Sequence, residues 1–164
     1  MKKFFLCIVV ALAAMGANAQ VTWNVRAGGG VLFESYHGYL DGVYGSGNVV
    51  VQANIPIIST TSLTISPSLN MEFSDYVNFN LPLHLGYKIP IAHKTIFFPK
   101  IGPMIGIGFE TDYSYNPYFL FGPSAELALE IKHFVISLNG YYNAIQSGYY
   151  DMVGGLFATI GYKF

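Results

Sequence analysis

From Trp23 onward, apolar residues alternate with small or polar residues at a period of two. This alternation is typical of β-strands that present one face to an apolar environment. In the first such stretch Trp23 and Val25 share one face, and Asn24 and Arg26 share the other. Eight alternating stretches follow one another, beginning near Trp23, Val49, Leu63, Phe79, Ile101, Phe119, Phe134 and Gly155. The sequence therefore predicts an all-β chain of eight antiparallel strands.

The composition favours strands whose apolar face meets lipid. Only 10% of the residues are charged and 52% are hydrophobic, whereas ordinary soluble domains have about 25% charged residues. Each predicted strand has roughly the 9–11 residues, or more, that a tilted transmembrane strand needs. In lipid every backbone N–H and C=O must be satisfied internally, so the sheet must close on itself. We predict an eight-stranded antiparallel up-and-down transmembrane β-barrel whose last strand pairs with its first.

The N-terminal residues have the pattern of a secretory signal. Lys2 and Lys3 precede an apolar segment over residues 4–14, and a small-x-small cleavage site follows at residues 17–19. The apolar segment is shorter than the roughly 20 residues of a membrane-spanning helix. We expect a cleavable signal peptide over residues 1–19 and an outer-membrane β-barrel domain over residues 20–164. The single cysteine, Cys7, lies inside the signal, so the mature chain should have no disulfide or thiolate metal site.

The connections between the predicted strands alternate in length. The longer ones cover residues 35–47, 74–78, 111–118 and 146–151, and the shorter ones cover residues 58–61, 92–94 and 132. Outer-membrane barrels combine long outer loops with short periplasmic turns. The long connections contain Asp41, Asp75, Asp112 and Asp151, whereas the short turns and adjoining strand ends contain Lys88, Lys94, Lys132 and Lys163. We expect an acidic outer side and a basic periplasmic side.

Three charged residues on the polar faces are expected to meet inside the barrel. Arg26, Lys100 and Glu126 each lie four to six residues from the periplasmic end of their predicted strands. An eight-stranded barrel is just wide enough to be filled by its own side chains, and unpaired buried charges would be very costly. We predict an internal ion-pair layer in a lumen filled by polar side chains. A soluble, lipocalin-like carrier would instead direct its apolar face toward a ligand cavity.

Four prolines do not fit a regular closed sheet. Each removes a donor from the hydrogen-bond ladder, and a closed barrel has no edge strand to accommodate them. The prolines within predicted strands are Pro67, Pro82, Pro103 and Pro123. We expect them in bulges or near the rims.

Several segments resemble a known family. The stretches "SLTISPSLNMEFSD", "FNLPLHLGYKIP", "PKIGPMIGIGF" and "GLFATIGYKF" together are similar to the small outer-membrane β-barrel domain family of Bacteroides-type bacteria. The alternating residues Ile160, Tyr162 and Phe164 resemble the assembly signal that is read by the barrel insertion machinery. The resemblance implies an outer-membrane location and contact with that machinery, with membrane lipid and with lipopolysaccharide.

Tyrosines are concentrated at the predicted outer rim, namely Tyr36, Tyr39, Tyr44, Tyr76, Tyr113, Tyr115, Tyr149 and Tyr150. An aromatic girdle at the lipid–water boundary accounts for about half of them. Tyr39, Tyr44 and Tyr113 fall deepest in the predicted loops and are candidates for contact with a surface ligand. We therefore predict a monomeric barrel with a structural or surface-adhesive role and no catalysis.

An enzyme that modifies lipid A is the main alternative. The outer-membrane lipid A palmitoyltransferase is similar in size and strand number and uses His, Asp and Ser in outer loops, where this chain has His37 and Ser74-Asp75. That enzyme holds an acyl chain in an apolar lumen, whereas the lumen predicted here carries charges. His133 and Ser137 lack the His-x-Ser spacing of the lipid A deacylases. A small pore is a further alternative, but a filled eight-stranded barrel leaves no continuous channel.

No metal, cofactor or nucleic-acid site is expected. The four histidines, His37, His84, His93 and His133, are scattered over both predicted ends and the lumen. Residues 28–30 are glycines but lack the spacing of a phosphate-binding loop. The whole chain has only 8 Lys and Arg residues, so it offers no basic footprint for nucleic acid.

The enzymatic alternative makes a testable prediction at His37. If the chain does not modify lipid A, replacing His37 with Ala should leave the acylation pattern of lipid A unchanged, because no catalytic base has been removed. Mass spectrometry of lipid A from cells that express the wild type, His37→Ala or the control His93→Ala checks this. Altered acylation in the His37 variant alone would favour the enzyme.

Overall fold

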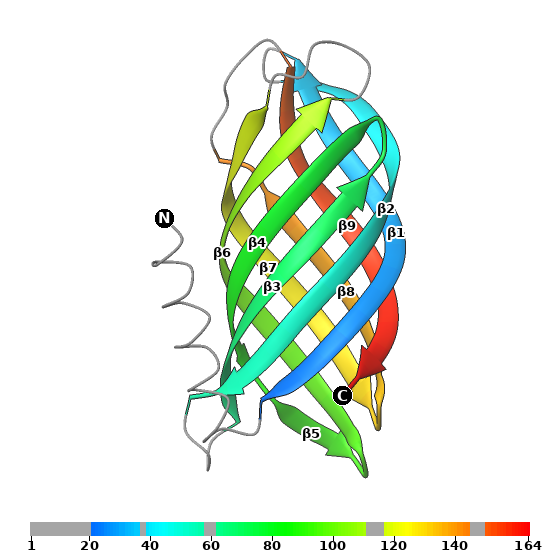
Figure 1. Cartoon of the computed structure of the whole chain (residues 1–164), viewed down its shortest axis with the longest axis vertical. Helices are drawn as coiled ribbons and strands as arrows, with labels where there is room; N and C mark the ends of the chain where they lie inside the picture. The colour runs from blue at the N-terminus through cyan, green and yellow to red at the C-terminus, as the bar shows by residue number, and fades with distance from the viewer. Residues whose placement is uncertain (1–20, 37–38, 58–61, 111–116, 145–149) are drawn as a thin grey trace, which may run out of the picture.

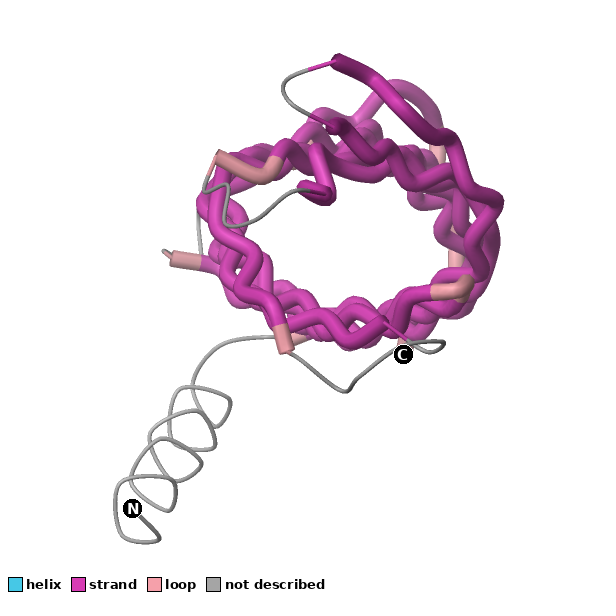
Figure 2. Tube along the Cα trace, turned by 90° about the horizontal axis from the view of Figure 1, so that it is seen from above, coloured by secondary structure: helices cyan, strands magenta, loops and turns pink. Residues whose placement is uncertain are grey.

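The computed structural model describes residues 21–36, 39–57, 62–110, 117–144 and 150–164, which form one antiparallel sheet closed into a barrel (Figure 1). The strands are β1 (Thr22–Tyr36), β2 (Tyr39–Pro56), β3 (Leu63–Phe73), β4 (Tyr76–Tyr87), β5 (Ile89–Ala92), β6 (Thr95–Glu110), β7 (Tyr118–Ile131), β8 (Phe134–Tyr142) and β9 (Tyr150–Lys163). Viewed from above, they form a closed ring (Figure 2). Among the described residues, no helix is long and apolar enough to cross a membrane.

Eight of these strands make the wall. β4 and β5 are separated by Lys88 alone, and both pair with β6, so β5 continues the path of β4. The first strand pairs with the last over most of its length, from Asn24 opposite Lys163 to Tyr36 opposite Tyr150. Together with the pairing of β4 and β6, this contact closes the sheet. The predicted all-β, closed eight-stranded antiparallel barrel is confirmed.

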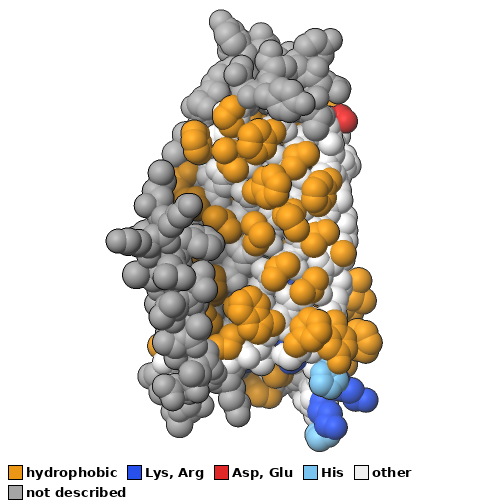
Figure 3. Space-filling model, viewed as in Figure 1, with side chains coloured by type: hydrophobic (Ala, Val, Ile, Leu, Met, Phe, Trp, Pro, Cys, Tyr) orange, Lys and Arg blue, Asp and Glu red, His pale blue; other side chains and the backbone are white. Residues whose placement is uncertain are grey.

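The two faces of the wall have the polarity expected for a membrane barrel. In β7, Phe119 and Leu127 are exposed on the outside, whereas Glu126 and Glu130 are buried in the lumen. Hydrophobic side chains cover the visible wall in Figure 3, and Lys, Arg and His side chains gather at its lower end. A soluble barrel would show the reverse arrangement, since its apolar side chains would point inward.

The two ends of the barrel differ in their connections. Two-residue turns join β5 to β6 at residues 93–94 and β7 to β8 at residues 132–133. We call this the turn end and the opposite one the loop end. The predicted acidic loops are only partly found, because Asp75 lies in the connection after β3, whereas Asp41 and Asp151 lie in strands. Asp112 is outside the described residues.

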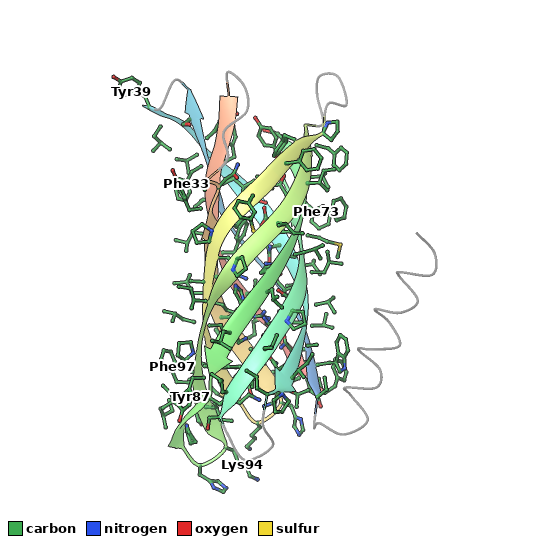
Figure 4. The ribbon with its side chains drawn as sticks, turned by 90° about the vertical axis from the view of Figure 1, so that its left-hand side faces the viewer. Phe33, Tyr39, Phe73, Tyr87, Lys94 and Phe97 are labelled. Atoms are coloured by element: carbon green, nitrogen blue, oxygen red, sulfur yellow. The ribbon has the colours of Figure 1, made fainter. Side chains whose placement is uncertain are left out.

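The predicted loop over residues 35–47 is wrong. β1 continues to Tyr36 and β2 begins at Tyr39, so almost all of this segment is a paired hairpin. Gly, Ser and Asp residues give the segment a loop-like composition that hides its strand character. The pairing of β1 with β2 changes register between Glu34 and Ser35, where the outer part of the hairpin begins. Tyr39, at the start of β2, lies away from the barrel wall (Figure 4).

The in-strand prolines lie neither at the rims nor in bulges, contrary to expectation. Pro67 pairs with Leu83 of β4, and Pro103 of β6 lies opposite Pro123 of β7. Pairing of β3 with β4 lapses beside Pro67 and resumes in the same register. The ladder therefore omits hydrogen bonds at this level instead of inserting a residue. The four prolines lie in the consecutive wall strands β3, β4, β6 and β7.

The lumen is not filled by polar side chains alone, which corrects the sequence-based expectation. Two apolar clusters are buried inside, one of Leu32, Met104, Leu120 and Phe157 and one of Phe98, Ala128 and Val135. Glycines on neighbouring strands provide the space. A Cβ atom on Gly30 would lie 2.7 Å from the Phe157 ring, and one on Gly86 would lie 2.6 Å from the Phe98 ring.

Gly86 offers a direct test of this packing. Replacing Gly86 with Ala should lower the free energy of unfolding by about 1–3 kcal/mol, because the new methyl group would overlap Phe98 and Lys100. Gly45→Ala is the matched control, since nothing lies within 4 Å of its Cβ position. Urea unfolding of the barrel in detergent micelles measures both. Equal stability of the two variants would contradict the packing described.

Candidate functional site

The structure brings Arg26, Lys100 and Glu126 together inside the barrel. Arg26 of β1 donates from Nη1 to Glu126 Oε1 at 2.5 Å and from Nη2 to Glu126 Oε2 at 3.2 Å. Lys100 of β6 donates from Nζ to Glu126 Oε1 at 2.8 Å. All three side chains are at least 97% buried. We call this group the central ion cluster, and it connects β1 to strands on the other side of the lumen.

Further polar residues complete the cluster, and the sequence did not single them out. Gln52 of β2 accepts from Lys100 Nζ at 2.6 Å and donates to Glu126 Oε2 at 3.0 Å. Arg26 also donates to Ser137 Oγ, which bonds Thr159. Gln52 stood on the polar face of its predicted strand, but alternation alone could not show which polar residue would face Glu126.

The cluster contains two cations and one carboxylate. The excess positive charge is partly accommodated by Phe98, whose ring centroid lies 4.3 Å from Lys100 Nζ. His84 lies nearby, with Nδ1 3.9 Å from Glu126 Oε2 and Nε2 2.8 Å from Ser124 Oγ. The charged groups are buried and paired with one another, so the cluster joins strands on opposite sides of the barrel and occupies the lumen.

Two further buried carboxylates are bound by neutral donors. Glu72 accepts hydrogen bonds from Asn78, Asn80 and Tyr141 at 2.7–3.0 Å. Glu34 accepts from the hydroxyls of Tyr44 and Tyr76 at 2.9 and 2.8 Å. Tyr44, Tyr76 and Tyr141 also pack against the apolar cluster that contains Leu32. The same side chains therefore make both polar and apolar contacts in this half of the lumen.

The three tyrosines predicted to contact a surface ligand have different positions. Tyr44 does not lie in a loop, because it belongs to β2 and its hydroxyl donates to Glu34 inside the barrel. Tyr39 is 80% exposed at the start of β2, near the exposed residues Leu40 and Val43. Tyr113 is outside the described residues. Tyr39 alone of the three therefore has a described position that suits contact with a partner.

The residues that resemble an assembly signal lie on the outside of the barrel, two of them in β9 and one directly after it. Ile160, Tyr162 and Phe164 are all exposed on the wall. The Tyr162 ring packs against Phe164 at 5.1 Å and stacks on His133 at 5.5 Å between centroids. The backbone N–H of Phe164 donates to the carbonyl of Trp23 at 2.8 Å, so the final residues are fixed against β1.

The groups considered for catalysis or metal binding are not brought together. His84 lies in the lumen, whereas His93 and His133 belong to turns at the opposite end from Ser74 and Asp75. His37 is outside the described residues. Within the part of the chain that the structure describes, no group of three or more His, Cys, Asp or Glu residues could hold a metal ion.

A closed eight-stranded barrel with an apolar outer face and a filled lumen is the fold of small Gram-negative outer-membrane β-barrels. A scan against protein-family models and a search of curated protein sequences each found no match.

Solved structures of this class are similar in fold. Neisserial surface protein A aligns with a TM-score of 0.63 at 11% identity, over 86% of this chain and 95% of that chain. The N-terminal β-barrel domain of Pseudomonas aeruginosa OprF aligns with a TM-score of 0.57 at 10% identity, over 90% and 100%. The attachment invasion locus protein Ail of Yersinia pestis aligns with a TM-score of 0.50 at 15% identity, over 87% and 98%. At these identities the likeness concerns the fold, and the narrower Bacteroides-type grouping stays a prediction.

The central ion cluster makes Arg26 the most informative position. Replacing Arg26 with Leu should lower the free energy of unfolding by about 3–5 kcal/mol, because Glu126 loses its bidentate partner while remaining buried. Arg26→Lys keeps the charge and should be less destabilising. Urea unfolding in micelles compares the variants, and an unchanged midpoint in Arg26→Leu would show that the cluster does not stabilise the fold.

Proposed function

We propose that the chain is a monomeric outer-membrane protein that anchors in the membrane through its barrel and presents its loop end at the cell surface. Residues 1–19 would direct export, and residues 20–164 would form the membrane domain. The turn end would then face the periplasm. Support comes from the exposed apolar wall, the closed sheet and the fold shared with other outer-membrane barrels.

The filled lumen is the observation that carries this proposal. Arg26, Lys100, Glu126 and Gln52 are mutually bonded across it. Two buried apolar clusters occupy further sections. Transport of a solute would require these groups to separate and leave charges unpaired in a low-dielectric interior. A structural or surface role therefore fits better than a pore, and the proposal includes no catalytic step.

Assembly is the second part of the proposal. Ile160, Tyr162 and Phe164 would act as the signal for the barrel insertion machinery before β9 pairs with β1. In the folded protein the same side chains face outward, beside Phe134. They would therefore contact lipid once the barrel has closed.

The β1–β2 hairpin is the best described candidate for surface contact. Tyr39, Leu40 and Val43 are 80%, 64% and 55% exposed. Hot spots of protein interfaces are enriched in aromatic residues such as Tyr, and their energy comes from burial in a partner pocket. An apolar or aromatic surface on a host or bacterial protein would suit these residues.

The comparison with Ail helps to define the partner. A second structure of the Yersinia pestis protein is a complex with the heparin analogue sucrose octasulfate. In the present chain, by contrast, the described Lys and Arg side chains lie in the lumen or at the turn end, and residues 37–38, 111–116 and 145–149 include no Lys or Arg. We therefore propose a contact surface at the hairpin that is formed by exposed apolar and aromatic side chains and contains no Lys or Arg.

The proposed surface role is tested by attachment. Cells that express the full chain should adhere to an epithelial monolayer more strongly than cells without it. Replacing Tyr39 and Leu40 with Ser should reduce attachment by about tenfold, because an exposed aromatic contact is lost. Tyr87→Ser is the matched control, since Tyr87 is 54% exposed near the opposite end of the barrel (Figure 4). Equal attachment with and without the protein would count against adhesion.

A further inference from the structure

The turn end carries a compact group of basic side chains. The β5–β6 and β7–β8 turns lie side by side, since the backbone N–H of Lys132 donates to the carbonyl of Lys94 at 2.9 Å. Lys94, Lys132, His133 and Lys163 line a cavity of about 370 Å³ together with Ile96 and Glu130. We call this cavity the basic pocket. Lys94 is labelled in Figure 4, and the basic group is visible at the lower end of Figure 3.

Two lysines of the basic pocket occupy backbone positions that favour glycine. Lys94 has φ of 60° and Lys132 has φ of 54°, and within the described residues these are the non-glycine residues with positive φ. A non-glycine residue in the left-handed region is uncommon and carries some strain. Strained backbone positions often accompany a functional requirement. Here the tight two-residue hairpin turns themselves account for the positive φ values, and the result for the surface is that two cations lie at adjacent turn tips.

The charges in the basic pocket are not balanced. Lys163 Nζ lies 2.6 Å from Glu130 Oε2, so this lysine is paired. Lys94 and Lys132 are exposed and make no ion pair with a described residue. Three lysines and one carboxylate leave an excess of two positive charges, with histidine neutral. The basic pocket is therefore suited to an anionic group that approaches from outside the protein.

An exposed aromatic group adjoins the basic pocket. His133 stacks on Tyr162, whose ring also contacts Phe134 and Phe164. Phe134 and Phe164 are 59% and 72% exposed and continue the apolar outer wall. A ligand at this position would meet cations at one end and an apolar surface at the other. A phospholipid has this combination, whereas a cell-wall peptide would use only the charges.

We propose that the basic pocket binds the phosphate of an anionic phospholipid headgroup in the periplasmic leaflet. Lys94 and Lys132 supply the charge, and the acyl chains lie along Phe134 and Tyr162. This inference rests on the proposed outer-membrane placement. The site would hold the barrel at a fixed depth in the membrane, because the turn tips would be tied to the headgroup layer.

Trp23 provides a local reporter for this site. It is the single tryptophan of the chain, it is 53% exposed, and its neighbour Asn24 pairs with Lys163 of the pocket. The full mature chain is folded into vesicles that contain brominated phosphatidylglycerol or brominated phosphatidylcholine, and quenching of Trp23 fluorescence is compared. We expect the anionic lipid to bind about fivefold more strongly, and this preference to weaken as salt is added.

Two double variants separate charge from structure. Lys94→Gly with Lys132→Gly removes both charges at positions that favour glycine, so the barrel should keep its unfolding midpoint but lose its lipid preference. Lys94→Arg with Lys132→Arg should retain the preference. If both lipids quench the wild type equally, the inference is overturned while the membrane placement stands. If neither lipid quenches Trp23, the membrane placement itself fails.

Cosedimentation with purified murein sacculi tests the competing partner. Binding to sacculi that depends on Lys94 and Lys132, together with equal quenching by the two lipids, would assign the basic pocket to the cell wall and overturn the phospholipid proposal. Absence of sacculus binding, with a lipid preference that the glycine variant loses, would support it.

Discussion

Pairing between the first and last strands is the contact on which the rest of this structure depends. A sheet surrounded by lipid has no water to satisfy its edges, so an open β1 or β9 would expose a row of unpaired backbone groups. The register from Asn24 opposite Lys163 to Tyr36 opposite Tyr150 removes that edge. Closure also determines the size of the lumen, since eight strands leave room for little beyond side chains. The contents of the lumen follow from this limit.

The interior combines charges that must be paired with large side chains that must fit. Glu126 is contacted by Arg26, Lys100 and Gln52, which come from three other strands, so the cluster links distant parts of the wall. Phe98 and Phe157 fit because glycines lie beside them. The same arrangement obstructs a channel, which favours interaction at the two ends of the barrel. The exposed hairpin at the loop end and the basic pocket at the turn end are the surfaces on which such interactions are proposed.

Much of the fold could be predicted because alternation and closure are simple physical rules. The alternation of side chains along each strand predicts that Arg26 and Glu126 lie inside and that Phe119 lies outside, and the structure places them there. Alternation does not show where large apolar residues lie on the inward face, so it does not predict the apolar cluster around Leu32. Alternation does not single out Gln52, because its partners Glu126 and Lys100 come from strands distant in sequence. The hairpin through Tyr44 resembles a loop in the sequence because its glycines and serines hide the alternation. The sequence shows that the turn tips are basic, but only the fold of the chain brings their lysines to one cavity and gives both a positive φ.

The mobility of the protein in a detergent gel, with and without boiling, tests whether the chain forms a closed barrel with an outward apolar face. The sample is the outer-membrane fraction of cells that express the full chain. A closed barrel should resist the detergent until it is heated, because its backbone hydrogen bonds form a continuous ring. We expect a compact band before boiling and a slower band after it. A soluble protein with the same mobility in both samples would contradict the membrane barrel and favour a carrier whose apolar face lines a cavity.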